Sequence, residues 1–160
     1  MARTTLCLSL TLLCAAVFAA EQYNGPRPPK PDIPYLLHAD TLVPTEVTEA
    51  RQENRKKETL YTIAGASSPV KTPLPEPIFI MESKDVQPQD LQLYRMDVRD
   101  GNREVSMTGN RRHGDQRPFH LNVTKLGENL YRIEVEDALQ NGEYSLSPTS
   151  SNTAYCFEEY

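Results

Sequence analysis

The chain of 160 residues is acidic, with 22 Asp and Glu against 17 Lys and Arg and a formal net charge of −5 at pH 7. A nucleic-acid partner requires a concentrated basic surface, so this balance argues against nucleic-acid binding. The length is that of one domain with a tail, which is large enough to fold by packing alone.

The first predicted element is a cleavable export signal at residues 1–19. Arg3 gives a positive start, residues 6–17 carry no charge, and Val17-Phe18-Ala19 ends the run with the kind of residues that a signal peptidase recognises. The run is shorter than the roughly 20 apolar residues of a transmembrane helix. We therefore expect a mature protein that begins at Ala20, has no transmembrane segment, and lies in the periplasm, in the cell envelope or outside the cell.

Two of the three cysteines, Cys7 and Cys14, fall within this signal. A lipoprotein signal ending at Cys14 is the alternative, but Leu13 occupies the position where such signals carry a small residue. After cleavage, Cys156 is a lone thiol without a partner in the same chain.

Residues 20–44 are predicted to form a proline-rich leader. Its first part cannot form regular hydrogen-bonded structure and favours an extended conformation, because it contains Gly25 and five prolines, Pro26, Pro28, Pro29, Pro31 and Pro34. We interpret this part as a spacer or tether. A short apolar patch follows at residues 35–43, and we expect it to lie back against the domain.

Residues 45–58 are predicted to be a short charged helix or a linker. Thr45 is a candidate N-cap, and Glu53 and Lys57 are spaced four apart, as in a helix-stabilising ion pair. Only Val47 and Ala50 provide an apolar face, so tertiary contacts must decide between a solvated helix and a frayed linker.

From residue 60 to residue 160 the hydrophobic period changes to two, which predicts about seven short strands. Asp100-Gly101 is typical of a tight hairpin turn. A second hairpin is predicted around Gly127-Glu128-Asn129, with one face in the core and the other in water. Its expected core residues are Phe119, Leu121, Val123, Tyr131, Ile133 and Val135.

The segment 139–144 is similar to the turn into the penultimate strand of immunoglobulin-like domains, where a tyrosine hydroxyl bonds to backbone of the preceding corner. Tyr144 is the candidate for this structural corner. The fold class that we expect is therefore all-β, an immunoglobulin-like sandwich over residues 60–160. A closed barrel is the alternative, because alternation does not determine closure.

Several short motifs, spread over most of the chain, form a combination that resembles other proteins. They are Gly65-Ala66-Ser67-Ser68-Pro69-Val70, Leu93-Tyr94-Arg95, Gly142-Glu143-Tyr144-Ser145-Leu146 and Tyr155-Cys156-Phe157, with Leu36-Leu37-His38-Ala39-Asp40 and Val43-Pro44-Thr45-Glu46-Val47 upstream. In combination they resemble a group of uncharacterised exported bacterial proteins with a C-terminal immunoglobulin-like β domain. That group has no established activity, so the resemblance implies export and fold but no site.

No residue pattern is typical of a catalytic, metal or cofactor site. The histidines His38, His113 and His120 lie near no cysteine, and Ser67 and Ser68 lack the glycine pattern of a hydrolase nucleophile. We therefore expect a structural or protein-interaction module that is not an enzyme and uses no cofactor. The alternative is a hydrolase or a carbohydrate-active accessory domain, which a β-sandwich permits.

Two features of the sequence are candidates for a functional role. Arg111, Arg112, His113 and Arg117 concentrate positive charge in one loop, which we interpret as a candidate contact for an anion or for an unknown envelope or extracellular protein. Cys156 is out of phase with its aromatic neighbours, so we expect its thiol on the face away from the core. The patch at 35–43 is the segment that we expect to cover it.

The processing hypothesis has a direct test. N-terminal sequencing of exported protein should begin at Ala20, because Val17 and Ala19 fit the peptidase site and Leu13 disfavours acylation at Cys14. A lipid-modified Cys14 at the mature terminus would contradict the prediction.

Overall fold

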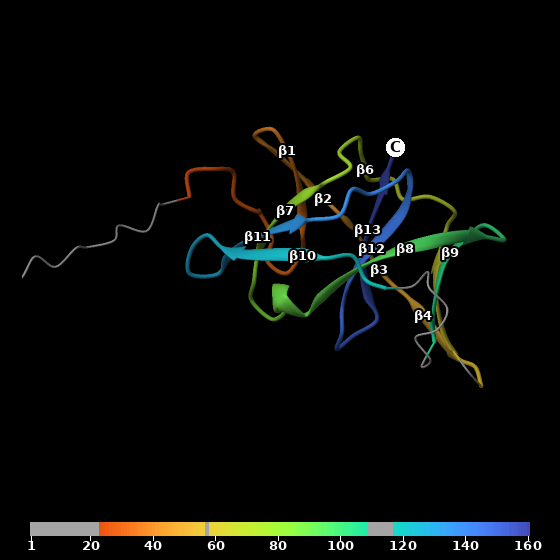
Figure 1. Cartoon of the computed structure of the whole chain (residues 1–160). Coiled ribbons are helices and arrows are strands. Elements are labelled where there is room, and N and C mark those ends of the chain that lie inside the picture. Colours follow the sequence, from red (N-terminus) through yellow and green to blue (C-terminus); the bar gives the residue numbers. More distant parts are fainter. Residues whose placement is uncertain (1–22, 57, 109–116) are drawn as a thin grey trace, which may run out of the picture.

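A computed structural model describes residues 23–56, 58–108 and 117–160 and contains thirteen strands in two sheets (Figure 1). Within the described residues, no helix is long and apolar enough to cross a bilayer. The predicted all-β sandwich class is confirmed. The elements are β1 (Tyr35–His38), β2 (Thr41–Pro44), β3 (Glu46–Glu49), β4 (Arg51–Asn54), β5 (Glu58–Ala64), β6 (Lys71–Thr72), β7 (Ile78–Glu82), the 3-10 turn η1 (Pro88–Asp90), β8 (Leu91–Arg99), β9 (Asn102–Thr108), β10 (Leu121–Lys125), β11 (Leu130–Val135), β12 (Gly142–Pro148) and β13 (Thr153–Glu159).

The first sheet has the strand order β10-β11-β7-β1-β2, with every pair antiparallel. Its central strand β7 is buried on both faces, which explains why residues 78–81 form a continuous apolar run. The predicted hairpin at 119–135 supplies β10 and β11, and its inward residues Ile133 and Val135 are buried as the alternation predicts.

The second sheet has the order β3-β13-β12-β8-β9-β5-β4, and β6 adds to β13 in parallel. Its two outermost strands, β3 and β4, are separated in the chain by Ala50 alone. A single residue spans only about 3.5 Å, so the two edges of this sheet must meet. We call the resulting closed arrangement of β3, β4, β5, β9, β8, β12 and β13 the strand ring.

The register of the strand ring places one set of side chains on its inside. Residues directly opposite one another in neighbouring strands share a face. Ser145 is opposite both Cys156 and Tyr94, and Val105 is opposite Tyr61. These side chains therefore point into the strand ring, and their chain neighbours point outward.

The outer face of β8, β12 and β13 packs against the first sheet and forms the sandwich core. Aromatic rings join the two sheets: the ring centroids of Phe79 and Phe157 are 5.4 Å apart, and those of Tyr144 and Phe157 are 5.6 Å apart. Leu36, Ile133 and other apolar side chains complete this core. Strands β12 and β13 are consequently buried on both faces.

The predicted turn at Asp100-Gly101 joins β8 to β9, and its two residues have φ values of +50° and +77°. Both values fall in the left-handed region, which Asp tolerates and Gly adopts at no steric cost. The sequence signal for this hairpin is confirmed.

Residues 45–58 contain strands β3 and β4, so the prediction of a charged helix or a linker is wrong. The Thr45 hydroxyl does not cap a helix; it donates to the carbonyl oxygen of Pro34 at 2.9 Å. The segment has a weak apolar face as a helix, whereas ladders with β13 and β5 satisfy its backbone groups. Tertiary pairing has overridden a weak local preference.

The β structure also begins earlier, and has more strands, than the sequence predicts. The apolar patch at 35–43 contributes to β1 and β2 of the first sheet, so the sheets take in strands from residue 35 onward and not only from residue 60. Strand pairing accounts for the higher count, because short polar strands such as β4 carry no period-two signal of their own.

The first part of the leader, of which residues 23–34 are described, packs against the fold. The Asp32 carboxylate accepts hydrogen bonds from the backbone N–H groups of Lys84, Asp85 and Val86 at 2.8 to 3.1 Å. Burial alone would raise the pKa of Asp32, but these three donors outweigh it and hold the pKa below its usual value. Pro28 and Pro34 are buried as well, so the end of the leader packs on the domain.

The register can be tested at Ile133. We expect Ile133→Asp to abolish cooperative folding, because an unpaired carboxylate would lie between the two sheets. The control is Glu136→Ala at an exposed position just beyond β11, which should change the free energy of unfolding by less than about 0.5 kcal/mol. Urea unfolding curves with equal midpoints for the two variants would show that the register is wrong.

Candidate functional site

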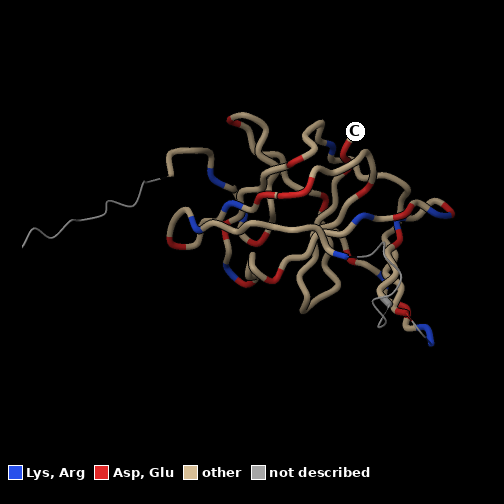
Figure 2. Tube along the Cα trace, in the orientation of Figure 1, with Lys and Arg blue, Asp and Glu red and all other residues tan. Residues whose placement is uncertain are grey.

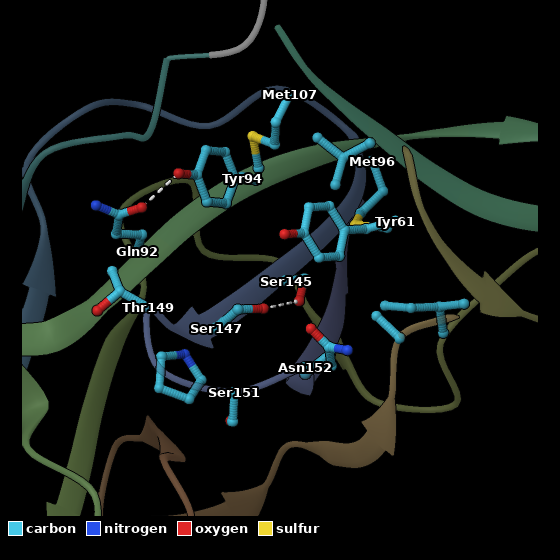
Figure 3. Close-up of a pocket in the computed structure, with 15 residues that line it drawn as sticks. Tyr61, Gln92, Tyr94, Met96, Met107, Ser145, Ser147, Thr149, Ser151 and Asn152 are labelled. Atoms are coloured by element: carbon cyan, nitrogen blue, oxygen red, sulfur yellow. Dashed lines mark hydrogen bonds between the residues drawn. The ribbon is translucent and has the colours of Figure 1, made fainter. Parts of the chain in front are cut away.

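The inside of the strand ring contains a cavity of ≈ 210 Å³ at one end (Figure 3). Its apolar lining includes Tyr61 and Ile63 from β5, Met96 from β8, and Val105 and Met107 from β9. All five alternate inward along their strands, so the same period-two pattern that builds the sheet also builds the cavity. Ala50 and Ala154 add small side chains where β3, β4 and β13 meet.

Polar side chains lie at the mouth of this cavity. Gln92, Thr149, Ser151 and Asn152 line its left and lower parts in Figure 3, and all four are exposed or half-buried. The Tyr94 hydroxyl donates to the side-chain carbonyl oxygen of Gln92, which orients that amide. Deeper inside, the hydroxyl oxygens of Ser145 and Ser147 are 3.0 Å apart and share a hydrogen bond. Among the described residues, no Asp, Glu, Lys, Arg or His lines the cavity.

The cavity exists because β8 and β9 separate beyond their common turn. The two strands pair only between residues 97–99 and 102–104. Further along, β8 pairs with β12 on one edge, and Leu93 forms an isolated bridge with Phe119. Tyr94 of β8 and Met107 of β9 therefore lie at a level where their two strands are no longer paired, and space remains between their side chains.

The opposite end of the strand ring is closed by the guanidinium group of Arg103, which is only 1% exposed. Its Nη1 and Nη2 donate to the two carboxylate oxygens of Glu46 at 2.7 and 3.0 Å. Nε donates to the carbonyl oxygen of Gly65 at 3.0 Å, and Nη2 also donates to that of Ala64 at 3.1 Å. A buried Arg with a bidentate partner and backbone acceptors is satisfied in charge and in hydrogen bonds.

The pKa values of two carboxylates near Arg103 are shifted in opposite directions. Burial alone would raise the pKa of Glu46, but hydrogen bonds from Arg103 and Ser68 and the positive charge of Arg103 hold the pKa below its usual value. Glu143 lies farther away, with Oε2 3.8 Å from Nη1 of Arg103 and accepting a hydrogen bond from the Ser68 backbone N–H at 3.0 Å. There burial dominates and raises the pKa of Glu143.

Cys156 is fully buried inside the strand ring, in a cluster with Ile63, Met96, Val105 and Ala154. Burial raises the pKa of its thiol to about 11, although the nearby Arg103 charge acts in the opposite direction. The thiol does lie on the face away from the sandwich core. The patch at 35–43 does not cover it, however, because β1 and β2 belong to the first sheet; the inward side chains of β5, β8 and β9 cover it instead.

The predicted basic loop falls only partly within the described chain. Arg111, Arg112 and His113 lie outside the described residues, and Arg117 is exposed. The anion or partner contact at this loop stays a prediction. Along the described chain, basic and acidic residues are interspersed in loops and at hairpin tips (Figure 2).

The Tyr144 hydroxyl donates to the carbonyl oxygen of Gln140 at 2.6 Å, which is the contact expected of a corner tyrosine. His38 is within hydrogen-bonding distance of Thr72, and His120 pairs with Asp137 at the surface. Within residues 23–56, 58–108 and 117–160, no three His, Cys, Asp or Glu side chains are grouped in a way that could hold a metal ion.

Sequence reasoning did not find the Arg103 cluster or the cavity. A signal for Arg103 is present in the sequence, because this residue is in phase with Val105 and Met107 on a strand whose apolar face is expected in the core. An arginine on the core face of a strand requires a buried acceptor. The cavity has no local signal, because it depends on how two strands diverge in space.

Comparison of the chain with protein-family models, with curated proteins and with solved structures found no match.

The ion pair at the closed end should be essential for stability. Glu46→Gln removes the bidentate partner of a buried guanidinium, so we expect the free energy of unfolding to fall by about 3 kcal/mol at pH 7. The control is Glu53→Gln, whose partner Arg55 is on the surface and whose loss should cost less than about 0.5 kcal/mol.

The pH dependence of stability gives the same experiment a second readout. Because folding lowers the pKa of Glu46 below the ordinary glutamate value of 4.5, its contribution is fully present above that value and is lost as the pH falls through the lowered pKa of the folded state. The wild type should therefore lose more stability on acidification than Glu46→Gln does. Parallel pH profiles for the two proteins would contradict this role of Glu46.

Proposed function

We propose that the mature chain acts outside the cytoplasm as a non-catalytic binding module and that the cavity of the strand ring is its binding site. The observation that carries the proposal is the cavity itself, a preformed concave space with an apolar lining and polar groups at its mouth. That combination is typical of sites that bind small molecules. The sequence predicts a structural or protein-interaction module, and the cavity is the reason that we propose small-molecule binding instead.

The closed end of the strand ring supports this proposal. The bonds of Arg103 to Glu46 and to the carbonyl groups of Ala64 and Gly65 tie together β9, β3 and the end of β5. A ring fixed at one end holds the lining residues in place, and preorganisation lowers the entropy cost of binding. Folding has built the cavity before any ligand arrives.

The lining favours binding over catalysis. General acid–base chemistry uses His, Glu, Asp or Lys most often, and none of these is among the described residues that line the cavity. We retain the hydrolase or carbohydrate-active accessory domain as the alternative hypothesis. We also retain the immunoglobulin-like relationship as a hypothesis, and the Tyr144 corner contact supports it.

Export is the remaining part of the proposal, and the composition of residues 1–19 supports it. The buried state of Cys156 is compatible with an oxidising compartment, because the thiol is protected from reagents in the folded protein.

The proposal is tested by ligand capture. Purified mature protein is incubated with a small-molecule extract of the culture medium and washed, and the molecules released by denaturation are identified by mass spectrometry. We expect at least one compound to be enriched on the wild type and lost from Ala50→Leu, which places a larger side chain on the cavity lining. The control is Val47→Ala, at a half-exposed position that points away from the ring interior. Equal recovery from all three proteins, or none from any, would contradict a binding role for the cavity.

A further inference from the structure

We propose that the ligand of this cavity is a small uncharged molecule with one or two apolar rings and a single hydroxyl or amide group. This inference rests on the proposed function, because it specifies the ligand class of the same site. It follows from three properties of the cavity: its charge, its volume and the chemistry of its lining.

The first property is the absence of charge from the described lining. The ionised groups Arg103 and Glu46 belong to the closed end of the strand ring, where they already neutralise one another. The described residues of the cavity lining offer no counter-charge. Among the described lining residues an ionised ligand would find no ionic partner to replace its lost hydration, so these residues select against ions.

The second property is size. Drug-sized ligands occupy pockets of about 300 to 1,000 Å³, and an apolar cavity of about 150 Å³ accepts a benzene-sized molecule. The volume of ≈ 210 Å³ lies between these limits. It is enough for the part of a ligand that consists of one or two fused rings.

The third property is the distribution of side-chain types. Tyr61, Tyr94, Met96 and Met107 surround the space in Figure 3. Aromatic faces and thioethers make favourable contacts with a flat ring, and methionine adapts to its outline. An apolar ring system is therefore the expected body of the ligand.

The polar groups of the cavity lining indicate the expected polar end of the ligand. Thr149, Ser151 and Asn152 are exposed and Gln92 is half-buried, so their hydroxyl and amide groups lie toward the mouth, whereas the lining residues Ile63 and Val105 are buried and apolar. A ligand with one neutral polar group can place its ring inside and hydrogen-bond at the mouth. Deeper inside, the hydroxyl groups of Ser145 and Ser147 already share a hydrogen bond, and Ile63 and Val105 are apolar. A second polar group on the ligand would therefore gain less there than at the mouth.

The test compares probes that share a naphthalene body and differ in head charge. Neutral 1-naphthol, anionic 1-naphthalenesulfonate and cationic 1-naphthylmethylammonium are titrated into the full mature protein by isothermal calorimetry at pH 7. Indole is added as a smaller neutral probe. We expect 1-naphthol or indole to bind at least tenfold more tightly than either ion.

Two variants locate the binding. Ala50→Leu and Ser147→Leu each enlarge a different side chain of the lining, so at least one of them should remain folded by circular dichroism and by thermal melting. Each folded variant should weaken binding of the neutral probe at least tenfold, whereas Val47→Ala should leave it unchanged.

The outcomes separate the two proposals. Ions that bind as tightly as 1-naphthol and are lost in the cavity variants would overturn the neutral ligand class and leave the binding function standing. If neither 1-naphthol nor indole binds, the proposed ligand class is wrong. The ligand-capture experiment tests the binding function independently of that result. If the neutral probe still binds to the folded cavity variants with unchanged affinity, the ligand does not occupy this cavity.

Discussion

The constraint on which the rest of the structure depends is the single-residue connection between β3 and β4. These two strands pair with opposite ends of the second sheet, with β13 on one side and β5 on the other, yet only Ala50 separates them. An open sheet cannot satisfy that connection, so the strands must curl until the edges meet. Once they do, alternate side chains of β5, β8, β9, β12 and β13 are directed into a shared interior.

The interior then divides by polarity. At one end lie Arg103, Glu46 and Glu143, whose charges, together with backbone carbonyl groups, satisfy one another. At the other end it places tyrosine, methionine and small aliphatic side chains that do not fill the space. The polar end is fixed by hydrogen bonds, and the apolar end contains the cavity that we propose as the binding site.

Many of the strands and turns could be predicted from sequence, and the exceptions have identifiable causes. The alternation at Ile133 and Val135 and the Asp100-Gly101 turn are local signals, and both appear in the structure as predicted. The helix prediction for segment 45–58 is wrong because strands at a seam are held by their partners and not by their own apolar pattern.

The candidate site was harder to predict than the fold. Ring closure, the divergence of β8 from β9, and the meeting of Arg103 with Glu46 all join positions far apart in the chain. No short motif encodes such contacts. Cys156 illustrates the difference: alternation predicts its face correctly, but not the segments that cover it.

The double burial of β12 and β13 has a consequence for how this protein can diverge in evolution. Ser145 and Cys156 face the ring interior, while Tyr144 and Phe157 on the same strands face the sandwich core, so substitutions there disturb two packed regions at once. Tyr61, Val105 and Met107 line the cavity without belonging to the sandwich core. Related proteins should therefore vary their ligand preference through β5 and β9, while β12 and β13 remain nearly unchanged.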